Sequence, residues 1–348
     1  MEHKRTAILY AILAASSYGI SAPVSKVLLT GLPPAIMASL LYLGAGIGMC
    51  IANLFRNNKT RNVEARITIK ELPYTTAMIA LDIAAPIFLM FGLSMTSSAT
   101  ASLLNNFEIV ATTVVALVVF KEAIGKRVWI SIALITLSSI ILTVEDLGNF
   151  SFSIGALLVL LACACWGIEN NCTRMLSLKD PLQIVVIKGL GSGAGSLLIA
   201  LFIGDVSTNL IFIPAALIVG FVAYGMSIRF YILAQRSLGA SRTSALYAFA
   251  PFIGVTLSLA VFRETPSVSF GVAFAMMCIG AYLAAFEKHE HEHEHVKLEH
   301  EHRHNHGDGH HNHKHEPPVV KEHSHAHIHT EQQHKHRHTP DLHHVHTH

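Results

Sequence analysis

The chain has 348 residues, of which 51% are hydrophobic and only 14% are charged. A soluble protein of this length cannot bury so much apolar surface in one core, so the composition indicates a membrane protein. The formal net charge of +2 gives no indication of a nucleic-acid partner. The five cysteines lie inside apolar stretches, where we interpret them as buried thiols and not as a disulfide framework.

Ten apolar stretches follow one another up to residue 286, each close to the roughly 20 residues that a spanning helix needs. They cover residues 6–29, 33–54, 73–94, 98–120, 126–144, 152–174, 181–203, 211–234, 240–262 and 266–286. No small-residue cleavage site follows the charged N-terminus, so the first stretch is interpreted as a retained helix. The sequence therefore predicts an all-α membrane protein with ten transmembrane helices in a lipid bilayer.

Lysine and arginine are distributed unevenly among the segments between these stretches. With the N-terminus inside, the internal segments contain most of the basic residues, including five within residues 56–70, whereas Glu145, Asp146 and Asp205 fall outside. Basic residues favour the cytoplasmic side of a membrane. We therefore expect a multi-pass protein of a bacterial-type plasma membrane with both termini in the cytoplasm.

Short motifs recur in the two halves of the chain. Tyr-Gly-Ile at 18–20 and Trp-Gly-Ile at 166–168 are each followed six residues later by a basic residue, and Phe-Lys-Glu at 120–122 matches Phe-Arg-Glu at 262–264. Each half contains five spans, an odd number, so the second half must be inverted relative to the first. We expect three units: residues 1–148, residues 149–287, and a histidine-rich tail at 288–348.

On these repeated motifs, the sequence resembles the ten-helix EamA type of the drug/metabolite transporter superfamily over residues 6–286. The resemblance implies a secondary transporter, coupled to an ion or driven by exchange, that moves a small metabolite or drug-like solute without a cofactor. It also implies a central cavity lined by helices 1, 3, 4, 6, 8 and 9. Family members usually carry a proline midway along helices 4 and 9. Pro251 fits that hinge position in helix 9, whereas helix 4 has Ile109 after Glu108 and is expected to be unbroken.

Acidic side chains inside the spans are costly in lipid and so mark candidate sites. Glu108 in helix 4, close to Asn105, is the first candidate, because a buried carboxyl group can take up and release a proton. Asp82 in helix 3 and Glu169 in helix 6 are further candidates for the cavity. If the three acids converge, the cavity favours protons, cations or zwitterions. The alternative for each acid is a structural hydrogen bond between helices.

Other side chains in the spans have more ambiguous roles. Tyr18 and Trp166 are expected to supply aromatic walls for the cavity. Lys188 and Arg229 are expected to extend their ammonium and guanidinium groups to the membrane interface, although either could instead neutralise an acid in the cavity.

Two glutamates and two runs of glycines complete the candidates in the membrane body. Glu122 and Glu264 close helices 4 and 9 and are interpreted as structural pins or gate contacts. Runs of glycine at 44–48 and 189–195 predict close helix packing within the subunit, with a homodimer as the alternative for the second run.

The C-terminal tail contains 23 of the 24 histidines, largely as His-x-His alternation. It lacks apolar periodicity and is expected to be disordered without a ligand. Alternating imidazoles suit Zn²⁺, Ni²⁺ or Co²⁺. The candidate ligands are His289, His291, His293, His295, His300, His302, His304, His306, His323, His325, His327 and His329.

The tail leaves two alternatives to a metabolite transporter. The body could transport a divalent metal that the tail supplies or senses, or it could anchor a metal-buffering tail without transporting anything. The predicted spans contain no histidine, which favours a metabolite transporter over a metal transporter. An enzyme is not expected, because the body shows no nucleophile–base pair and no nucleotide-binding loop.

Overall fold

The computed structural model describes most of the membrane body and short pieces of the tail. Its described backbone covers residues 2–55, 66–120, 125–146, 151–176, 179–205, 209–238, 243, 246–285, 290–295, 298–304, 323–329, 333–337 and 346–347. Side chains are described from 5 to 285 within these ranges, except at 120, 145–146, 151 and 235–237.

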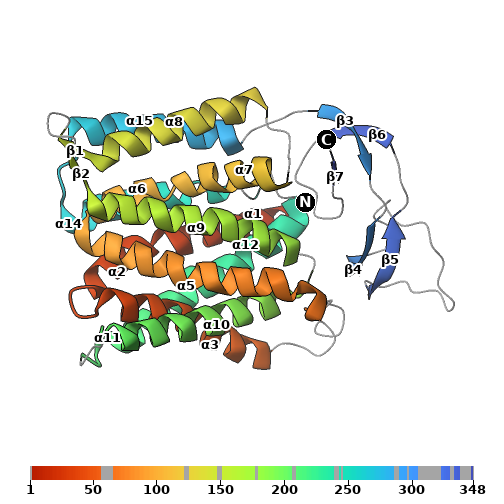
Figure 1. Ribbon diagram of the computed structural model, residues 1–348, viewed down its shortest axis with the longest axis horizontal. Coiled ribbons are helices and arrows are strands. Elements are labelled where there is room, and N and C mark those ends of the chain that lie inside the picture. The colour runs from red at the N-terminus through yellow and green to blue at the C-terminus, as the bar shows by residue number, and fades with distance from the viewer. Residues whose placement is uncertain are drawn as a thin grey trace.

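Long helices lying side by side form the body (Figure 1). The first half contains α1 (Glu2–Gly19), α2 (Ser21–Leu28), α3 (Pro34–Leu54), a 3₁₀ turn η1 (Ile69–Glu71), α5 (Leu72–Met95), α6 (Ser98–Leu104), α7 (Phe107–Phe120) and α8 (Lys126–Thr143). The second half contains α9 (Ile154–Leu176), α10 (Pro181–Phe202), α11 (Phe212–Val219), the π-helical segment η2 (Gly220–Met226), α12 (Ser227–Leu238), α14 (Ala250–Phe262) and α15 (Val268–Ala285). The predicted all-α membrane fold is confirmed.

Within the described ranges, nine helices are long and apolar enough to cross a bilayer, judged by length and composition. Four of them combine consecutive segments: α1 with α2, η1 with α5, α6 with α7, and α11 with η2 and α12. The shorter apolar helix α14 lies in the place of the ninth predicted span, part of which (240–242 and 244–245) falls outside the described residues. The ten predicted spans thus correspond to nine spanning helices and this shorter one.

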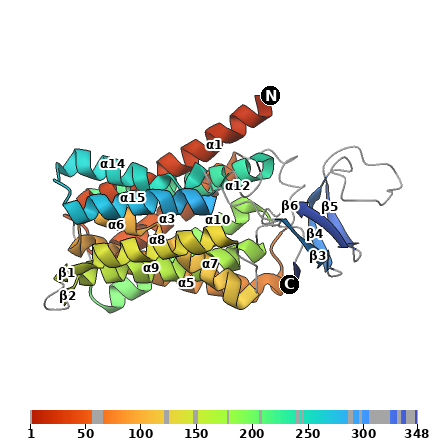
Figure 2. The same cartoon turned by 90° about the horizontal axis from the view of Figure 1, so that it is seen from above.

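Helices of the first half pack on helices of the second half throughout the bundle (Figures 1 and 2). α3 packs on α10, α6 on α14 and α8 on α15, so each of these helices contacts its counterpart five spans later. α1 packs on α12 and α5 on α9. In a two-fold repeat, each span of one half corresponds to the span five places along the chain in the other half. The first span, with α1, then corresponds to α9, and the eighth span, with α12, corresponds to α5, so the α1–α12 contact corresponds to the α9–α5 contact. The whole packing scheme therefore agrees with inverted repeats.

Glycines bring two of these helix pairs into backbone contact. A Cβ atom on Gly189 would lie 2.4 Å from the backbone N of Gly46, so α3 and α10 have no room for a side chain there. A Cβ atom on Gly92 would lie 2.7 Å from the carbonyl O of Gly155, where α5 crosses α9. Small residues allow such approach between helices in lipid. The glycine run at 189–195 thus packs within the subunit, and a homodimer stays a prediction.

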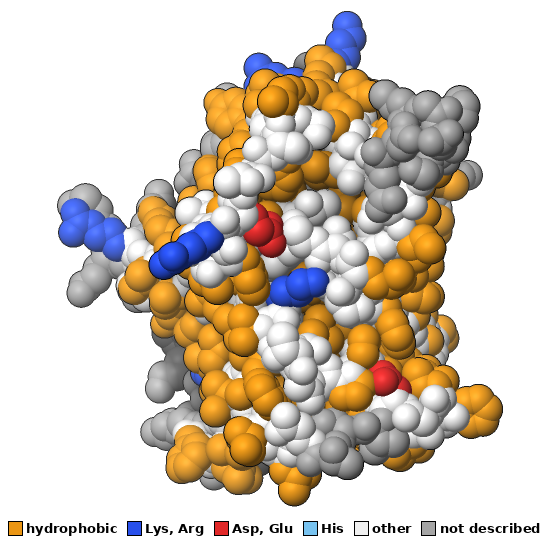
Figure 3. Space-filling view, turned by 90° about the vertical axis from the view of Figure 1, so that its left-hand side faces the viewer, with side chains coloured by type: hydrophobic (Ala, Val, Ile, Leu, Met, Phe, Trp, Pro, Cys, Tyr) orange, Lys and Arg blue, Asp and Glu red, His pale blue; other side chains and the backbone are white. Residues whose placement is uncertain are grey.

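Polar side chains fasten helix ends at the end of the bundle opposite the N-terminus. Lys26 Nζ donates to the carbonyls of Leu93 (2.6 Å) and Thr96 (2.8 Å) where α5 ends. Asp205 Oδ2 accepts from the backbone N–H of Ala35 (2.7 Å) where α3 begins. Both contacts satisfy backbone groups that a helix end leaves without partners. Figure 3 views this end of the molecule, where a few basic and acidic side chains lie among apolar and neutral ones.

Short strands account for the remaining described backbone. β1 (Val144–Asp146) pairs with β2 (Ser151–Phe152) between the halves. In the tail, β3 (Glu290–His295) pairs with β6 (Gln333–Arg337) and β7 (His346–Thr347), and β4 (Leu298–His304) pairs with β5 (His323–His329), all antiparallel. β1 and β2 lie at the end of the bundle opposite the N-terminus, whereas the strands of the tail lie at the same end as the N-terminus (Figures 1 and 2). The side chains of the tail are outside the description, and its disorder without a ligand stays a prediction.

Candidate substrate and coupling site

Three of the apolar helices are interrupted partway along their length. α1 ends at Gly19 and α2 begins at Ser21, whereas α6 ends at Leu104 and α7 begins at Phe107. A turn at 248–249 comes directly before α14. The expectation of an unbroken fourth helix is therefore wrong. The 142-residue offset between the halves places residues 105–106 opposite 247–248, so both repeats break at nearly the same position.

An asparagine accounts for the break in the fourth helix. Asn106 donates from Nδ2 to the carbonyl O of Leu103 (3.0 Å), and its backbone N–H donates to the same oxygen (3.2 Å). The next bond, from the N–H of Glu108 to the carbonyl O of Asn105 (3.1 Å), also has the three-residue spacing of a 3₁₀ turn. Short polar side chains compete with the helix for backbone carbonyls, so they can interrupt it without a proline.

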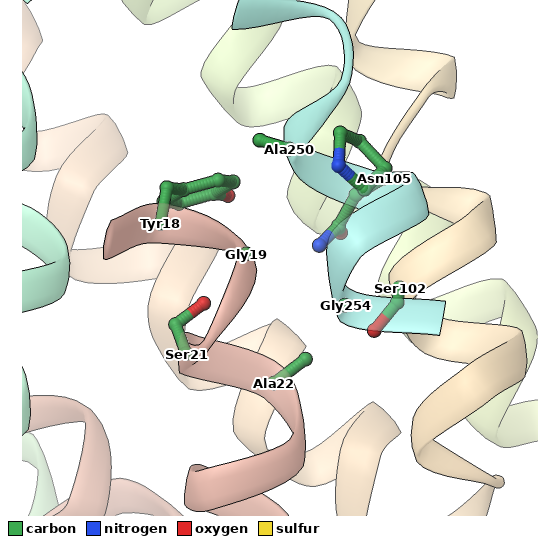
Figure 4. A pocket seen from close by; sticks show the side chains of 9 residues that line it. Tyr18, Gly19, Ser21, Ala22, Ser102, Asn105, Ala250 and Gly254 are labelled. Atoms are coloured by element: carbon green, nitrogen blue, oxygen red, sulfur yellow. The ribbon is translucent and has the colours of Figure 1, made fainter. Parts of the chain in front are cut away.

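The three interrupted helices surround a small cleft (Figure 4). Its walls are Tyr18, Gly19, Ser21 and Ala22 from the first helix, Ser102 and Asn105 from the fourth, and Ala250, Pro251 and Gly254 from the ninth. The space among these residues is about 170 Å³ when the part open to solvent is counted. Even this upper value is below the roughly 300–1,000 Å³ of typical ligand pockets, so a ligand of metabolite size requires the helices to separate.

The cleft is polar but carries no formal charge on its lining residues. The hydroxyl of Ser102 is buried and has no hydrogen-bond partner among the described groups. A Cβ atom on Gly19 would lie 2.7 Å from the carbonyl O of Ala250, so the first and ninth helices touch at the edge of the cleft. An unpartnered buried hydroxyl is costly, and a bound solute could satisfy it.

A buried charged network lies on three uninterrupted helices of the bundle, α5, α9 and α10. Lys188 on α10 places Nζ 3.0 Å from Asp82 Oδ2 on α5 and 2.9 Å from Glu169 Oε1 on α9. Asp82 is 0% exposed and Glu169 is 1% exposed, whereas Lys188 is 9% exposed. Thr173 also donates a hydrogen bond to Glu169. The structure therefore brings together two of the three predicted acids, with a lysine between them.

The expectation that Lys188 extends to the membrane interface is not met, and the alternative of an acid-neutralising lysine describes its contacts. The sequence does contain a signal for this role: Asp82 and Glu169 both lie within predicted spans, and buried charges require partners of opposite charge. Arg229, by contrast, is exposed.

An aromatic chain connects this charged network to the cleft. Trp166 Nε1 donates to the hydroxyl of Tyr42 (3.3 Å), which in turn donates to Asp82 Oδ1 (2.9 Å). The ring of Tyr42 lies 5.4 Å from that of Tyr224, which lies 5.9 Å from that of Tyr18 in the cleft wall. Sequence reasoning missed Tyr42 and Tyr224, because a tyrosine in a span is compatible with ordinary core packing.

Glu108 lies apart from the other two acids and is partly buried. Its Oε1 accepts from Asn170 Nδ2 (2.7 Å), and the same amide donates to Thr112 Oγ1 (3.2 Å). Glu108 interacts electrostatically with Glu169 and Lys188. The acid on α7 is thus fastened to α9, next to the charged network.

The remaining predicted residues have separate locations. Pro251 lines the cleft, and its role as a hinge stays a prediction. Glu264 follows α14 at the far end of the bundle, within electrostatic reach of Lys26. Glu122 lies outside the described residues.

Metal-ligating residues do not gather in the described part of the membrane body. Within it, no group of three or more His, Cys, Asp or Glu side chains could hold a metal ion. The histidines expected to bind Zn²⁺, Ni²⁺ or Co²⁺ belong to the tail, whose side chains are outside the description. A metal on the tail stays a prediction.

Comparison with known proteins identifies the family. A sequence model of the EamA-like transporter family matches residues 5–144 and again residues 153–286. The chain belongs to the EamA-like transporter family. An uncharacterized transporter of Methanothermobacter thermautotrophicus is 28% identical over 292 residues, which are 78% of this chain and 84% of that protein. A solved crystal structure with 17% identity covers 80% of this chain and 94% of its own, with a TM-score of 0.56. At that identity the likeness supports the fold alone. This EamA-like protein is a multi-pass membrane transporter of the drug/metabolite type.

Proposed function

We propose that this EamA-like protein is a secondary transporter that moves a small solute by alternating access, with its binding site at the cleft between the interrupted helices. The observation that carries the proposal is the meeting of three interrupted helices, from both repeats, around one polar cleft. Interrupted spans place free backbone groups and flexible joints at the substrate site of many secondary transporters. The cleft is too small for a metabolite as it stands, so substrate binding requires the two repeats to move.

Glu108 is the proposed coupling group. It lies on α7 immediately after the interruption of the fourth helix and is hydrogen-bonded to Asn170 on the straight helix α9. Protonation of the Glu108 carboxylate changes its bond with Asn170, because the ionised form only accepts hydrogen bonds whereas the protonated acid also donates one. Proton binding at Glu108 would therefore act directly on a contact between the two parts of the bundle. The lysine and arginine distribution supports a plasma-membrane location with both termini in the cytoplasm.

The first experiment identifies the solute. Metabolites and metals are compared inside and outside cells that express the wild-type chain or no chain, without a preselected list of solutes. A small metabolite whose distribution changes supports the proposal, whereas unchanged distributions of all solutes contradict transport.

The second experiment tests coupling with that solute in proteoliposomes. Glu108→Gln should keep solute exchange at equal pH on both sides but lose accumulation driven by a pH gradient. Glu71→Gln serves as the matched control, because Glu71 caps a helix start and pairs with Lys179 away from the cleft. If Glu108→Gln accumulates the solute as wild type does, Glu108 is not the coupling group.

A further inference from the structure

The pair Asp82 and Glu169 has the form of a cation-binding site that is already occupied. Two carboxylates from neighbouring helices, α5 and α9, hold one ammonium group at 3.0 and 2.9 Å. That ammonium belongs to Lys188 on a third helix, α10. We propose that Lys188 is a tethered cation at this site, and that the solute carried by the protein has a small primary ammonium group that takes its place. The second part of this proposal rests on the proposed transport function.

Exposure indicates the order in which the groups are reached. The acids are 0% and 1% exposed, whereas Lys188 is 9% exposed. Lys188 is therefore the most accessible of the three groups, and we infer that a second cation reaches the acids after the lysine has moved. A lysine suits this role, since its ammonium is a compact charge on a flexible four-carbon stem.

The contacts of Asp82 show which oxygen an arriving ammonium would use. Oδ1 accepts from Tyr42, which Trp166 orients from the other side. Oδ2 is buried and has the Lys188 ammonium, 3.0 Å away, as its charged partner. An arriving ammonium would take over this contact, because –NH₃⁺ carries three donors.

Charge selects the class of solute. Two carboxylates and one lysine leave an excess of one negative charge, and Glu108 adds another within electrostatic reach. An anion without a positive group would be repelled by this surplus, whereas an amine or a zwitterion would be attracted. The spacing of both carboxylates around one nitrogen favours a primary ammonium over a quaternary one, which has no N–H donors.

Replacement of the lysine tests the proposal with methylammonium as the probe. The full-length protein is purified as wild type, as Lys188→Met and as Asp82→Asn/Lys188→Met, and thermal unfolding is followed in methylammonium chloride. Tetramethylammonium chloride and sodium chloride at equal ionic strength are the controls. Lys188→Met should be stabilised saturably by methylammonium, at about a tenfold lower concentration than wild type requires, because the tethered competitor is gone. The double variant should respond more weakly, since one of the two carboxylates is neutral.

Three results would overturn the proposal: equal responses of wild type and Lys188→Met, equal responses to methylammonium and tetramethylammonium, or no response of Lys188→Met. If Lys188→Met does not fold alone, it is purified in each salt instead. Folding that depends on methylammonium supports the site, and failure to fold in all three salts contradicts it.

A transport measurement separates the two parts of the idea. Labelled methylammonium is followed in proteoliposomes that contain Lys188→Met. Selective binding without any movement across the membrane would leave the ammonium site standing and count against the proposed transport function. If Lys188→Met does not prefer methylammonium to tetramethylammonium in the binding test, the proposed role of Lys188 is contradicted, whatever the transport result.

Discussion

Two groups of helices in this bundle differ in construction. We call α3, α5, α9 and α10 the straight group, because each is one uninterrupted helix of more than 20 residues, even though α5 contains Pro86. Glycines bring α3 into close backbone contact with α10 and α5 into close backbone contact with α9. The broken group consists of α1 with α2, α6 with α7, and the ninth span that ends in α14. The charged network lies on the straight group, whereas the cleft lies among the broken helices. The contrast teaches that the buried charges and the walls of the cleft belong to different helices of this transporter.

The contact between Glu108 and Asn170 joins the two groups. Glu108 belongs to α7 of the broken group, and Asn170 belongs to α9 of the straight group. Close backbone contacts hold α3 against α10 and α5 against α9, whereas an interrupted helix can bend at its joint. Among the hydrogen bonds between the groups, this one involves an ionisable acid, so we propose it as the place where proton binding alters how the groups are held together.

The largest expected effect comes from the charge of the straight group. Lys188→Met leaves Asp82 and Glu169 unpaired and buried, which should cost about 3–5 kcal/mol in the free energy of unfolding. Asp82→Asn in the same chain should recover part of that loss, because one unpaired charge disappears. Denaturant unfolding in detergent gives both values.

The control is Lys179→Met, which removes the partner of Glu71 at a helix end. Glu71 is 18% exposed and also bonded to Thr68, so this change should cost no more than about 1 kcal/mol. Equal losses from the two lysines would show that the buried network has no special weight.

Close packing of the straight group gives the second effect. Gly189→Ala forces a methyl group to within 2.4 Å of the backbone N of Gly46, so α3 and α10 must separate. Overpacking of this kind costs about 1–3 kcal/mol. Gly271→Ala on α15 is the matched control, since no atom lies within 4 Å of the added Cβ. The control should unfold at the same temperature or slightly higher; a loss as large as that of Gly189→Ala would contradict the packing argument.

The break in the fourth helix gives the third effect, with opposite signs for stability and rate. Asn106→Leu removes a buried amide whose Oδ1 has no partner among the described groups, and it removes the side chain that competes for the carbonyl of Leu103. Stability should rise by about 1 kcal/mol or stay unchanged. Solute exchange should slow, because a continuous helix bends less readily. If the variant has a continuous fourth helix and exchanges the solute as fast as wild type or faster, the interruption is not needed for transport.

The smallest effect lies at the end of the broken group. Arg263 follows α14 with φ of 51°, in the left-handed region that favours glycine. Arg263→Gly should stabilise the protein by roughly 0.5–1 kcal/mol, seen as a higher midpoint of thermal unfolding. Arg263→Ala keeps the strained conformation and should give no such gain, so equal gains in both variants would assign the effect to the lost charge.

For much of the candidate site, the sequence shows which helix carries each residue but not which residue it contacts. Asp82, Glu108 and Glu169 stand out because acids in apolar stretches are rare and costly. Their contacts depend on which faces of α5, α7 and α9 meet, and spacing along one helix does not determine that. Lys188 illustrates the limit, since a lysine seven residues into a span can reach the interface or an acid with the same stem.

The fourth helix illustrates a different limit. Its sequence lacks the proline of the ninth helix, and this absence predicts a continuous helix. The structure breaks at Asn105 and Asn106 instead, through a side-chain bond that only the folded backbone reveals. Proline breaks a helix by its covalent structure, which a sequence shows, whereas asparagine breaks it by a choice between competing hydrogen-bond partners.

The sequence by itself determined the membrane class, the number and order of the spans and the inverted repeat, because hydrophobic length and motif spacing are properties of the chain in isolation. Only the tertiary structure decided that Lys188 stands between Asp82 and Glu169, that Glu108 bonds to Asn170, and that the interrupted helices meet at one cleft. Those facts depend on helix–helix contacts between residues far apart in the chain, where glycines and two-fold packing set which faces touch. Only the tertiary structure shows that the buried charges and the interrupted helices around the cleft lie in different parts of the bundle.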